Sequence, residues 1–361
     1  MSALQGLSPM IWFPRSRFGA RALATMLLAA ALLVVAILAI GIGPMALSPS
    51  RVVDILRAGP HSDAFPVGEV VIVWQIRLPR VVMAMMVGAM LALGGAVMQG
   101  LFRNPLADPT ILGVSSGAAL GAVSMIVLGS GLLAPVSLLL GAYALPIAAF
   151  LGALTVTLVL YTISTQGGAT SVATMLLAGV ALAAFAAAIM GYLVFLSDDT
   201  QLRDVTFWNL GGLGGVTWEK VVVSCPIMLV VIGLALSMAR GLDALVLGEA
   251  EAFHMGLRVE RLKRQAVLLV AVATGLAVAV AGTIGFVGIV VPHLLRLAVG
   301  ADHRFLLPAS CLGGALLILL ADIGARMLVA PAELPIGIIT AAIGAPFFLW
   351  LLIRRRGFVG F

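Results

Sequence analysis

The sequence is poor in charged residues, and this shortage limits the class of protein. Asp, Glu, Lys and Arg make up only 10% of the 361 residues, whereas hydrophobic types make up 62%. Soluble globular domains carry about 25% charged residues. The composition therefore excludes an ordinary soluble domain and indicates that long uncharged runs face lipid.

Cysteine, lysine and histidine are also scarce, and their placement excludes several kinds of chemistry. Cys225 and Cys311 fall in apolar runs, where a free thiol behaves as a small hydrophobic group, so neither a disulfide nor a metal pair is expected. Neither lysine, Lys220 or Lys263, follows a glycine, which excludes a P-loop for ATP. The histidines are scattered at positions 61, 254, 293 and 303. We therefore expect no metal site and no catalytic residues.

Apolar runs recur along the chain at lengths that suit membrane helices. A bilayer core about 30 Å thick needs about 20 apolar residues per helix, because backbone groups in lipid must bond within the segment. The predicted spans are residues 22–43, 79–101, 110–130, 144–165, 171–196, 217–238, 266–284, 286–299, 305–329 and 335–353. The chain is therefore predicted to be one all-α polytopic membrane domain over residues 1–361. Short or broken helices are expected near Pro105–Pro109 and Gly282–Gly288.

The basic residues set the expected orientation. About ten spans put both termini on one side, and placing them in the cytoplasm puts most Lys and Arg there. Residues 1–21 then form a cytoplasmic tail before an anchor helix whose apolar run is too long for a signal peptide. Residues 44–78 and 197–216 become periplasmic segments, and residues 239–265 become a cytoplasmic loop. Because the basic residues are not gathered on one face, nucleic acid is not an expected partner.

The stretch Arg240–Arg264 concentrates charge within this apolar chain. Its hydrophobic residues have the spacing by which two short helices would present an apolar edge: Leu242, Leu245, Val246, Phe253 and Leu257. A solvated loop needs no such edge, whereas a docking surface for another protein does. The pattern therefore predicts a cytoplasmic docking site.

The predicted bundle lacks groups that would transduce energy. Proton-coupled carriers usually place ionisable residues inside the membrane, and no paired carboxylates are visible there. Asp322 and Arg326 come nearest, and their i,i+4 spacing predicts an ion pair near the outer end of a span. We therefore favour a transport channel driven by a separate partner. A secondary carrier working alone and a membrane enzyme are the alternatives from other classes.

Several motifs follow one another in a characteristic order: Arg77–Arg80, Gly94–Pro109, Leu112–Gly117, Leu176–Leu182, Leu247–Leu257, Gly285–Arg296 and Leu320–Arg326. In this order they resemble the FecCD family, the permease subunits of ABC importers for iron-siderophores, haem and vitamin B12. The resemblance covers nearly all of residues 70–356. It implies a type II importer permease fold in the bacterial inner membrane.

The resemblance also implies partners. These are a second copy of the chain, two ATPase subunits that carry ATP and Mg²⁺, and a periplasmic substrate-binding protein; no cofactor is expected on this chain. The residues matching the family's ATPase-coupling helices are Leu245, Leu247, Gly248, Glu249, Phe253, Met255, Gly256 and Leu257. The family's outer arginines, which meet acids of the binding protein, match Arg77, Arg80 and Arg326. Interfacial anchoring at a helix start is the alternative for Arg77 and Arg80.

Gates and cargo follow from the same resemblance. Asn104 and Leu106 match a cytoplasmic gate, and the span around Leu177 to Phe195 would line the path. A second cytoplasmic lip carries hydroxyl residues in the family; the aligned positions here are Val172 and Ala173, with Thr170 and Ser171 just upstream. Phe207 and Trp208, before a glycine-rich run, would belong to the periplasmic gate segment and are similar to haem permeases. Haem is the expected cargo, with an iron-siderophore or vitamin B12 as alternatives.

Overall fold

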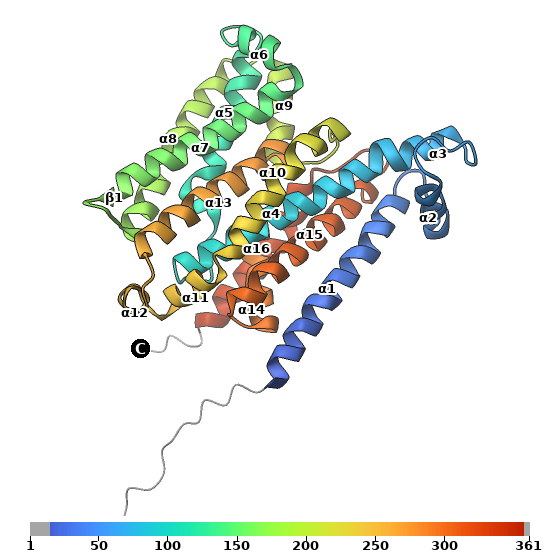
Figure 1. The fold of residues 1–361 in the computed structure, drawn as a ribbon. Helices are drawn as coiled ribbons and strands as arrows, with labels where there is room; N and C mark the ends of the chain where they lie inside the picture. Colours follow the sequence, from blue (N-terminus) through green and yellow to red (C-terminus); the bar gives the residue numbers. More distant parts are fainter. Residues whose placement is uncertain (1–14, 357–361) are drawn as a thin grey trace, which may run out of the picture.

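Helices make up nearly all of the regular structure in residues 15–356, the part of the chain that the computed structural model describes (Figure 1). The long helices are α1 (Arg15–Gly41), α4 (Leu78–Leu101), α7 (Ala144–Ser164), α8 (Val172–Phe195), α10 (Trp218–Ser237), α13 (Val259–Ala281), α15 (His303–Met327) and α16 (Ile336–Arg356). Shorter ones are α2 (Pro49–Ala58), α3 (Val67–Val71), η1 (Ile72–Arg77), η2 (Pro109–Leu112), α5 (Val114–Leu128), α6 (Ala134–Leu140), η3 (Gly141–Tyr143), α9 (Asp199–Leu210), α11 (Ala239–Leu247), α12 (Glu249–His254) and α14 (Val287–Val299).

The helices match the predicted membrane spans closely. Seven stretches within residues 15–356 are long and apolar enough to cross a membrane, and the shorter apolar helices α5, α14 and α16 add three more. The prediction of about ten membrane helices is therefore confirmed. Helix α1 begins at Arg15, inside the predicted tail of residues 1–21, so the cytoplasmic location of that tail stays a prediction; residues 1–14 lie outside the described part of the chain.

The centre of the bundle is α4. Almost every residue from Pro79 to Leu101 is buried, because α4 is covered by α13, α14 and α15. A helix that is hydrophobic on all sides needs such neighbours. Its glycines allow close approach, since a side chain on Gly88 would collide with the backbone of Gly314 in α15.

Small residues also join α5 to α7. Gly117 and Gly121 of the GxxxG motif lie against the backbone of Gly152 and Ala148 in α7. A side chain at either glycine would overlap the facing carbonyl group. The motif therefore serves close helix packing.

The connection from α4 to α5 turns back into the bundle. Asp108 is buried and lies beside Gly288, at the level of Leu91 and Gly95 in the middle of α4. Helix α5 therefore starts part of the way into the bundle, which explains why it has only 15 residues. Non-helical backbone at this depth is tolerated because protein surrounds it. The predicted break near Pro105–Pro109 is confirmed, and a second break at Gly282–Phe286 separates α13 from α14.

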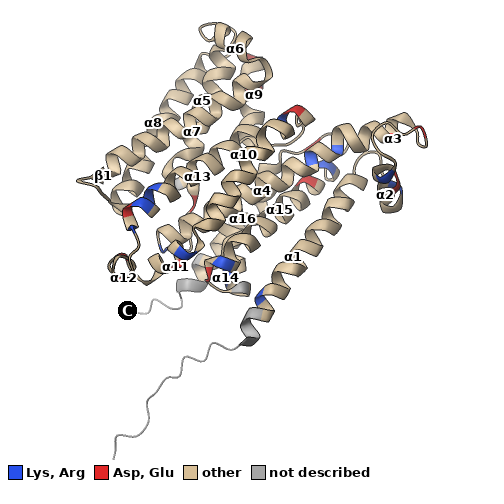
Figure 2. Ribbon diagram, viewed as in Figure 1, with Lys and Arg blue, Asp and Glu red and all other residues tan. Residues whose placement is uncertain are grey.

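The bundle has two distinct ends (Figure 1). At the α12 end lie α11, α12, the start of α1, the end of α16 and a hairpin of strands β1 (Thr165–Gln166) and β2 (Ala169–Thr170). At the α9 end lie α2, α3, α6 and α9. Most charged residues lie toward these ends (Figure 2). This distribution is typical of a membrane bundle whose middle faces lipid.

Candidate transport path and coupling site

Two short helices form the tip of the α12 end. Helix α11 ends at Gly248, whose φ of 135° lies in the region that favours glycine, and α12 follows at once. A second turn with positive φ at Gly256 leads from α12 toward α13. The sequence therefore predicted the helix pair correctly, although the last part of residues 239–265 is not a loop but the beginning of α13.

The tip has an inner and an outer face. Leu242 and Leu245 are fully buried against the bundle, where α11 packs on α4 and α15. The side chains that project outward are Val246, Leu247, Phe253 and Met255, and Phe253 is 69% exposed. The prediction that Leu242 and Leu245 belong to a docking edge is wrong, because they anchor α11 to its own chain. Leu257 is half-buried.

A buried lysine joins three elements behind this tip. The Lys263 ammonium, on α13, donates to Glu249 Oε2 of α12 at 2.7 Å and to Glu260 Oε1 at 3.0 Å. It also donates to the carbonyl oxygen of Thr170 in β2 at 3.3 Å. The other oxygen of Glu260 accepts from the Thr170 amide at 3.0 Å. Figure 2 shows basic and acidic residues meeting at the start of α13 near β1.

The predicted cytoplasmic gate residues lie in two separate segments. Asn104 is exposed in the α4–α5 connection, and its Oδ1 accepts from the Leu106 amide at 3.0 Å. Thr170 ends the hairpin, and Ser171 caps α8 by accepting from the Thr174 amide. The hydrogen bonds of the described chain do not link the two pairs, and their role as gates stays a prediction.

One side of α8 is apolar and uncovered by the rest of the described chain. Leu177, Val180, Phe185, Tyr192 and Phe195 are each more than 60% exposed. No charged residue occurs anywhere in this helix. Such a face needs lipid or another protein surface to cover it.

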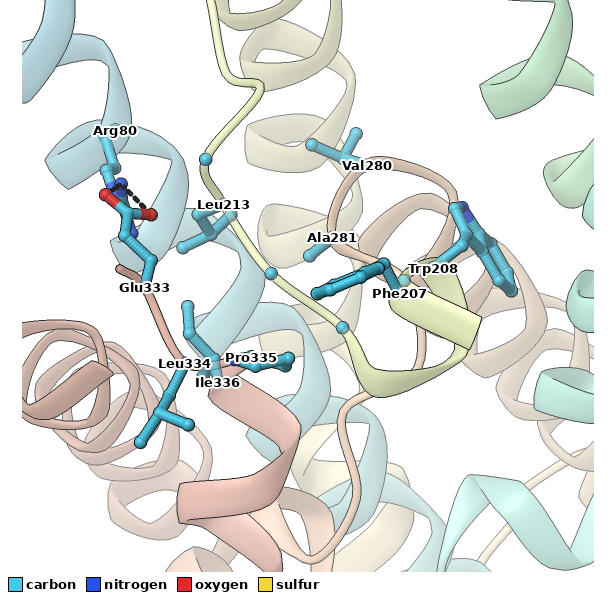
Figure 3. Close-up of a pocket in the computed structure, with 14 residues that line it drawn as sticks. Arg80, Phe207, Trp208, Leu213, Val280, Ala281, Glu333, Leu334, Pro335 and Ile336 are labelled. Carbon is cyan, nitrogen blue, oxygen red and sulfur yellow. Dashed lines mark hydrogen bonds and ion pairs between the residues drawn. The ribbon is translucent and has the colours of Figure 1, made fainter. Parts of the chain in front are cut away.

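A cavity of about 330 Å³ opens at the α9 end. Figure 3 shows the Arg80–Glu333 pair on one side, and Phe207 and Trp208 on the other. The backbone of the glycine-rich run Gly211–Gly214 and the start of α16 complete its wall. The structure thus brings the two predicted aromatic residues of the outer gate segment to a cavity.

The predicted outer arginines are turned inward. Arg77 donates to the carbonyl oxygens of Ile40 and Gly41 at 2.7 and 2.9 Å, and Arg326 donates to those of Ala39 and Ile42 at 3.0 and 2.8 Å. These carbonyls are at the end of α1, where a helix leaves its last acceptors unpaired and favours a cation. Helix α1 has no basic residue in its own last turn.

Arg80 is also occupied internally. Its Nε donates to Asp322 at 2.8 Å and its Nη1 to Glu333 at 2.9 Å. Asp322 pairs with Arg326 at 3.1 Å as well, which confirms the predicted i,i+4 ion pair. All three arginines are less than 10% exposed. The prediction that they present free charges to a binding protein is therefore wrong for this conformation, because groups of the same chain already satisfy them.

Sequence reasoning missed a second link at the α12 end. Asp243 of α11 accepts from the His303 amide at 2.8 Å and lies 2.7 Å from His303 Nδ1 at the start of α15. Burial raises the pKa of Asp243, but the hydrogen bonds from His303 outweigh it and lower the pKa below its ordinary value. The separation of 60 positions between these residues gives no local sequence signal.

The role of Lys263 was also missed. The one signal in the sequence was the rarity of lysine, since the chain has only two.

The sequence is similar to those of known permease proteins. The hemin transport system permease protein HmuU of Yersinia pestis is 48% identical over 285 residues, which are 79% of this chain and 84% of HmuU. The vitamin B12 import system permease protein BtuC of Klebsiella pneumoniae is 43% identical over 285 residues, which are 79% of this chain and 83% of that protein. BtuC of Salmonella typhi is 44% identical over 282 residues, covering 78% and 83%.

A solved structure agrees with these sequence relatives. The inward-facing conformation of a metal-chelate type ABC transporter superposes with a TM-score of 0.79 at 34% identity, covering 95% of this chain and all of that chain. Residues 31–354 match the FecCD transport family. The ordered helices, the paired helices of the α12 end and these matches lead to one conclusion: the chain is an ABC importer permease and belongs to the FecCD transport family.

Proposed function

We propose that two copies of this chain form the membrane path of a haem importer in the bacterial inner membrane. Two separate ATPase subunits drive it from the cytoplasm, and a periplasmic binding protein delivers the cargo. The proposal is carried by the tip of α11 and α12, which exposes Leu247, Phe253 and Met255 on a rigid anchor. An apolar centre with a charged rim is typical of a protein interface.

The ATPase is the proposed partner of this tip. On the buried face of α11, Leu242 and Leu245 fix this helix to α4 and α15. A force applied to the tip would therefore reach the helices of the bundle. This arrangement suits a subunit that receives mechanical work and carries no ATP site of its own.

The second copy is proposed to cover part of the α8 face. Its exposed residues are apolar from Leu177 to Phe195, and small residues such as Ala181 and Gly191 separate the larger ones. A pathway wall without charge offers the cargo no ion pairs that would have to be broken during passage. In this proposal the path lies between the two copies of the dimer.

The orientation is proposed to place the α12 end in the cytoplasm. The starts and ends of the chain's membrane helices put Arg240, Arg258, Arg261 and Arg264 at that end. Basic residues in short loops are enriched on the cytoplasmic side. Both termini are then cytoplasmic, and the cavity at the α9 end opens to the periplasm.

Haem is favoured as the cargo by two observations. The identity to the hemin permease HmuU is 48%, against 44% to the BtuC proteins. The cavity at the α9 end also offers Phe207 and Trp208, whose rings suit stacking against a planar macrocycle. An iron-siderophore or vitamin B12 is the alternative cargo for the same machinery.

Transport by a reconstituted complex tests this function. The chain, its ATPase and its binding protein are placed in liposomes with ATP, and uptake of haem, vitamin B12 and a ferric siderophore is compared. ATP-dependent uptake of haem supports the proposal, and uptake of another cargo instead would correct it. Uptake by the chain without the ATPase would favour a secondary carrier.

A further inference from the structure

The Lys263 side chain is bonded to three different structural elements. Its three acceptors are Glu249 of α12, Glu260 of α13 and the Thr170 carbonyl of β2. An ammonium group has three donors, so every donor has an acceptor. The side chain is only 5% exposed, and its charge is therefore balanced within the protein.

Two side chains of α13 hold the hairpin at Thr170, one through the backbone amide of that residue and one through its carbonyl. The Thr170 amide donates to Glu260, and the Thr170 carbonyl accepts from Lys263. The turn between the strands, Gly167 and Gly168, has positive φ at both positions and lies in solvent. The tip of the hairpin is therefore exposed, whereas its end at Thr170 is fixed by two hydrogen bonds to α13.

Thr170 is next in the chain to the N-cap residue of α8. Ser171 follows Thr170 directly, and its side chain caps α8. Helix α8 carries the uncovered apolar face described above. A shift of Thr170 would therefore move the start of this helix.

On the other side, Lys263 holds the tip. Glu249 is the first residue of α12, and Lys263 is the group that its carboxylate contacts at 2.7 Å. The carboxylates of Glu249 and Glu260 both approach the one ammonium group. Displacement of α12 would pull Glu249 from Lys263 and change the bonds that remain to Glu260 and Thr170.

From this geometry we propose that Lys263 is a positioning residue that transmits movement of α12 to the 165–170 hairpin and to α8. The inference rests on the proposed function, because it takes an ATPase to move α12. It assigns to Lys263, Glu249 and Glu260 a role in coupling ATP hydrolysis to transport. In this role the three residues contact neither the cargo nor ATP.

The first test compares ATP hydrolysis with haem uptake by the complete complex in liposomes. For Lys263→Met, haem imported per ATP hydrolysed should fall about tenfold, while the rate of hydrolysis stays within about twofold of the wild type. Lys263→Arg keeps the charge and should restore most of the coupling. Lys220→Met, the same change at the other lysine, should leave both quantities unchanged, since Lys220 lies at the start of α10 and its ammonium donates to the Gly215 carbonyl, away from α12 and the hairpin.

Two further variants keep the test decisive. Glu249→Gln leaves the other two Lys263 contacts in place and should lower the uptake per ATP without loss of assembly. The double variant Glu249→Gln/Lys263→Met should be no worse than Lys263→Met alone, because both remove the same link. An unchanged ratio of uptake to hydrolysis in Lys263→Met would overturn the proposal. So would equal loss of both rates, which would show that Lys263 only holds the docking tip in place.

A second measurement needs no cargo and separates this inference from the proposed function. Hydrogen exchange is measured on the complex without nucleotide and after ATP hydrolysis in the presence of vanadate, which traps ADP on the ATPase. In the wild type, trapping should change the protection of both α12 and residues 165–171; in Lys263→Met only α12 should respond. A hairpin response that persists in Lys263→Met, or is missing from the wild type, refutes the link. Failure of wild-type haem uptake alone would count only against haem as the cargo.

Discussion

Arg80 Nε lies 2.8 Å from Asp322 Oδ1, and both side chains are buried, although the residues are 242 positions apart in the chain. This pair joins the start of α4 to α15 at the α9 end. Asp322 also neutralises Arg326, which caps α1, so one carboxylate supports the arrangement of three helices. The arginines of this end therefore organise the bundle.

Loss of Asp322 should destabilise the protein strongly. Asp322→Asn leaves Arg80 and Arg326 without their shared buried counter-charge, and breaking such a pair costs about 3–5 kcal/mol. Unfolding of the purified protein in detergent measures the change. Glu333→Gln is the matched control, because the Glu333 side chain is 43% exposed and its contribution should be below about 1 kcal/mol. Equal stability of the two variants would contradict the central role of Asp322.

The α5–α7 contact should not accept a side chain. Gly117→Val would place atoms against the Gly152 carbonyl and Val156, so we expect a loss of about 1–3 kcal/mol from overpacking. Gly233→Ala in α10 is the control, since nothing lies within 4 Å of its added carbon. Thermal unfolding in detergent should show a lower midpoint for Gly117→Val and no loss for Gly233→Ala. An unchanged unfolding midpoint in Gly117→Val would mean that α5 and α7 can move apart enough to admit the side chain.

Hydropathy predicted most of the fold because burial in lipid and helix formation coincide here. The predicted span 144–165 and helix α7 (Ala144–Ser164) differ by one residue. At α13 the prediction started at residue 266, whereas the helix starts at Val259. Its first residues include Glu260, Lys263 and Arg264, which form helices well in water but carry charge. Hydropathy therefore located the membrane part of α13 and missed its extension.

The side-chain partners could not be read from the sequence. Arg77 and Arg326 bind carbonyls of α1, which are 36 or more positions away. A motif can show that an arginine matters without showing whether it faces a partner or its own chain. Likewise, Lys263 meets the Thr170 carbonyl over 93 positions, and no spacing rule connects a lysine with a distant backbone group.

The Asp243–His303 link should give a stability term that depends on pH. The folded pKa of Asp243 is lower than its ordinary value of 3.8, so folding favours the ionised carboxylate. By linkage, the contribution is present above the unfolded pKa and is lost as the pH falls through the folded pKa. The stabilisation by Asp243 should therefore be measurable at neutral pH and vanish in strong acid.

Asp243→Ala provides the measurement. Removing the acceptor of the buried His303 amide should cost about 1–3 kcal/mol at pH 7. The difference from the wild type should shrink below about pH 4, following the depressed pKa. Asp54→Ala, at an exposed position of α2, is the control and should change stability by less than about 0.5 kcal/mol. A difference that does not decrease in acid would show that the carboxylate charge is unimportant.

The two faces of the α11–α12 tip should separate binding from folding. Leu245→Ala opens a cavity beside α4 and α15, so we expect a loss of about 2–5 kcal/mol in unfolding free energy. Phe253→Ala removes an exposed side chain and should leave the stability of the isolated chain within about 0.5 kcal/mol.

The exposed face of the tip should matter for affinity to the ATPase, although it matters little for stability. Phe253→Ala should weaken binding of the purified ATPase about tenfold or more, because an aromatic side chain at the centre of an interface is often a hot spot. Leu138→Ala, which removes an even more exposed apolar side chain from α6 at the other end, should not alter that affinity. The comparison is made by titrating the ATPase against each variant in detergent. If Phe253→Ala binds the ATPase as tightly as Leu138→Ala does, the ATPase docks elsewhere, and the tip would have no claim to be the coupling surface.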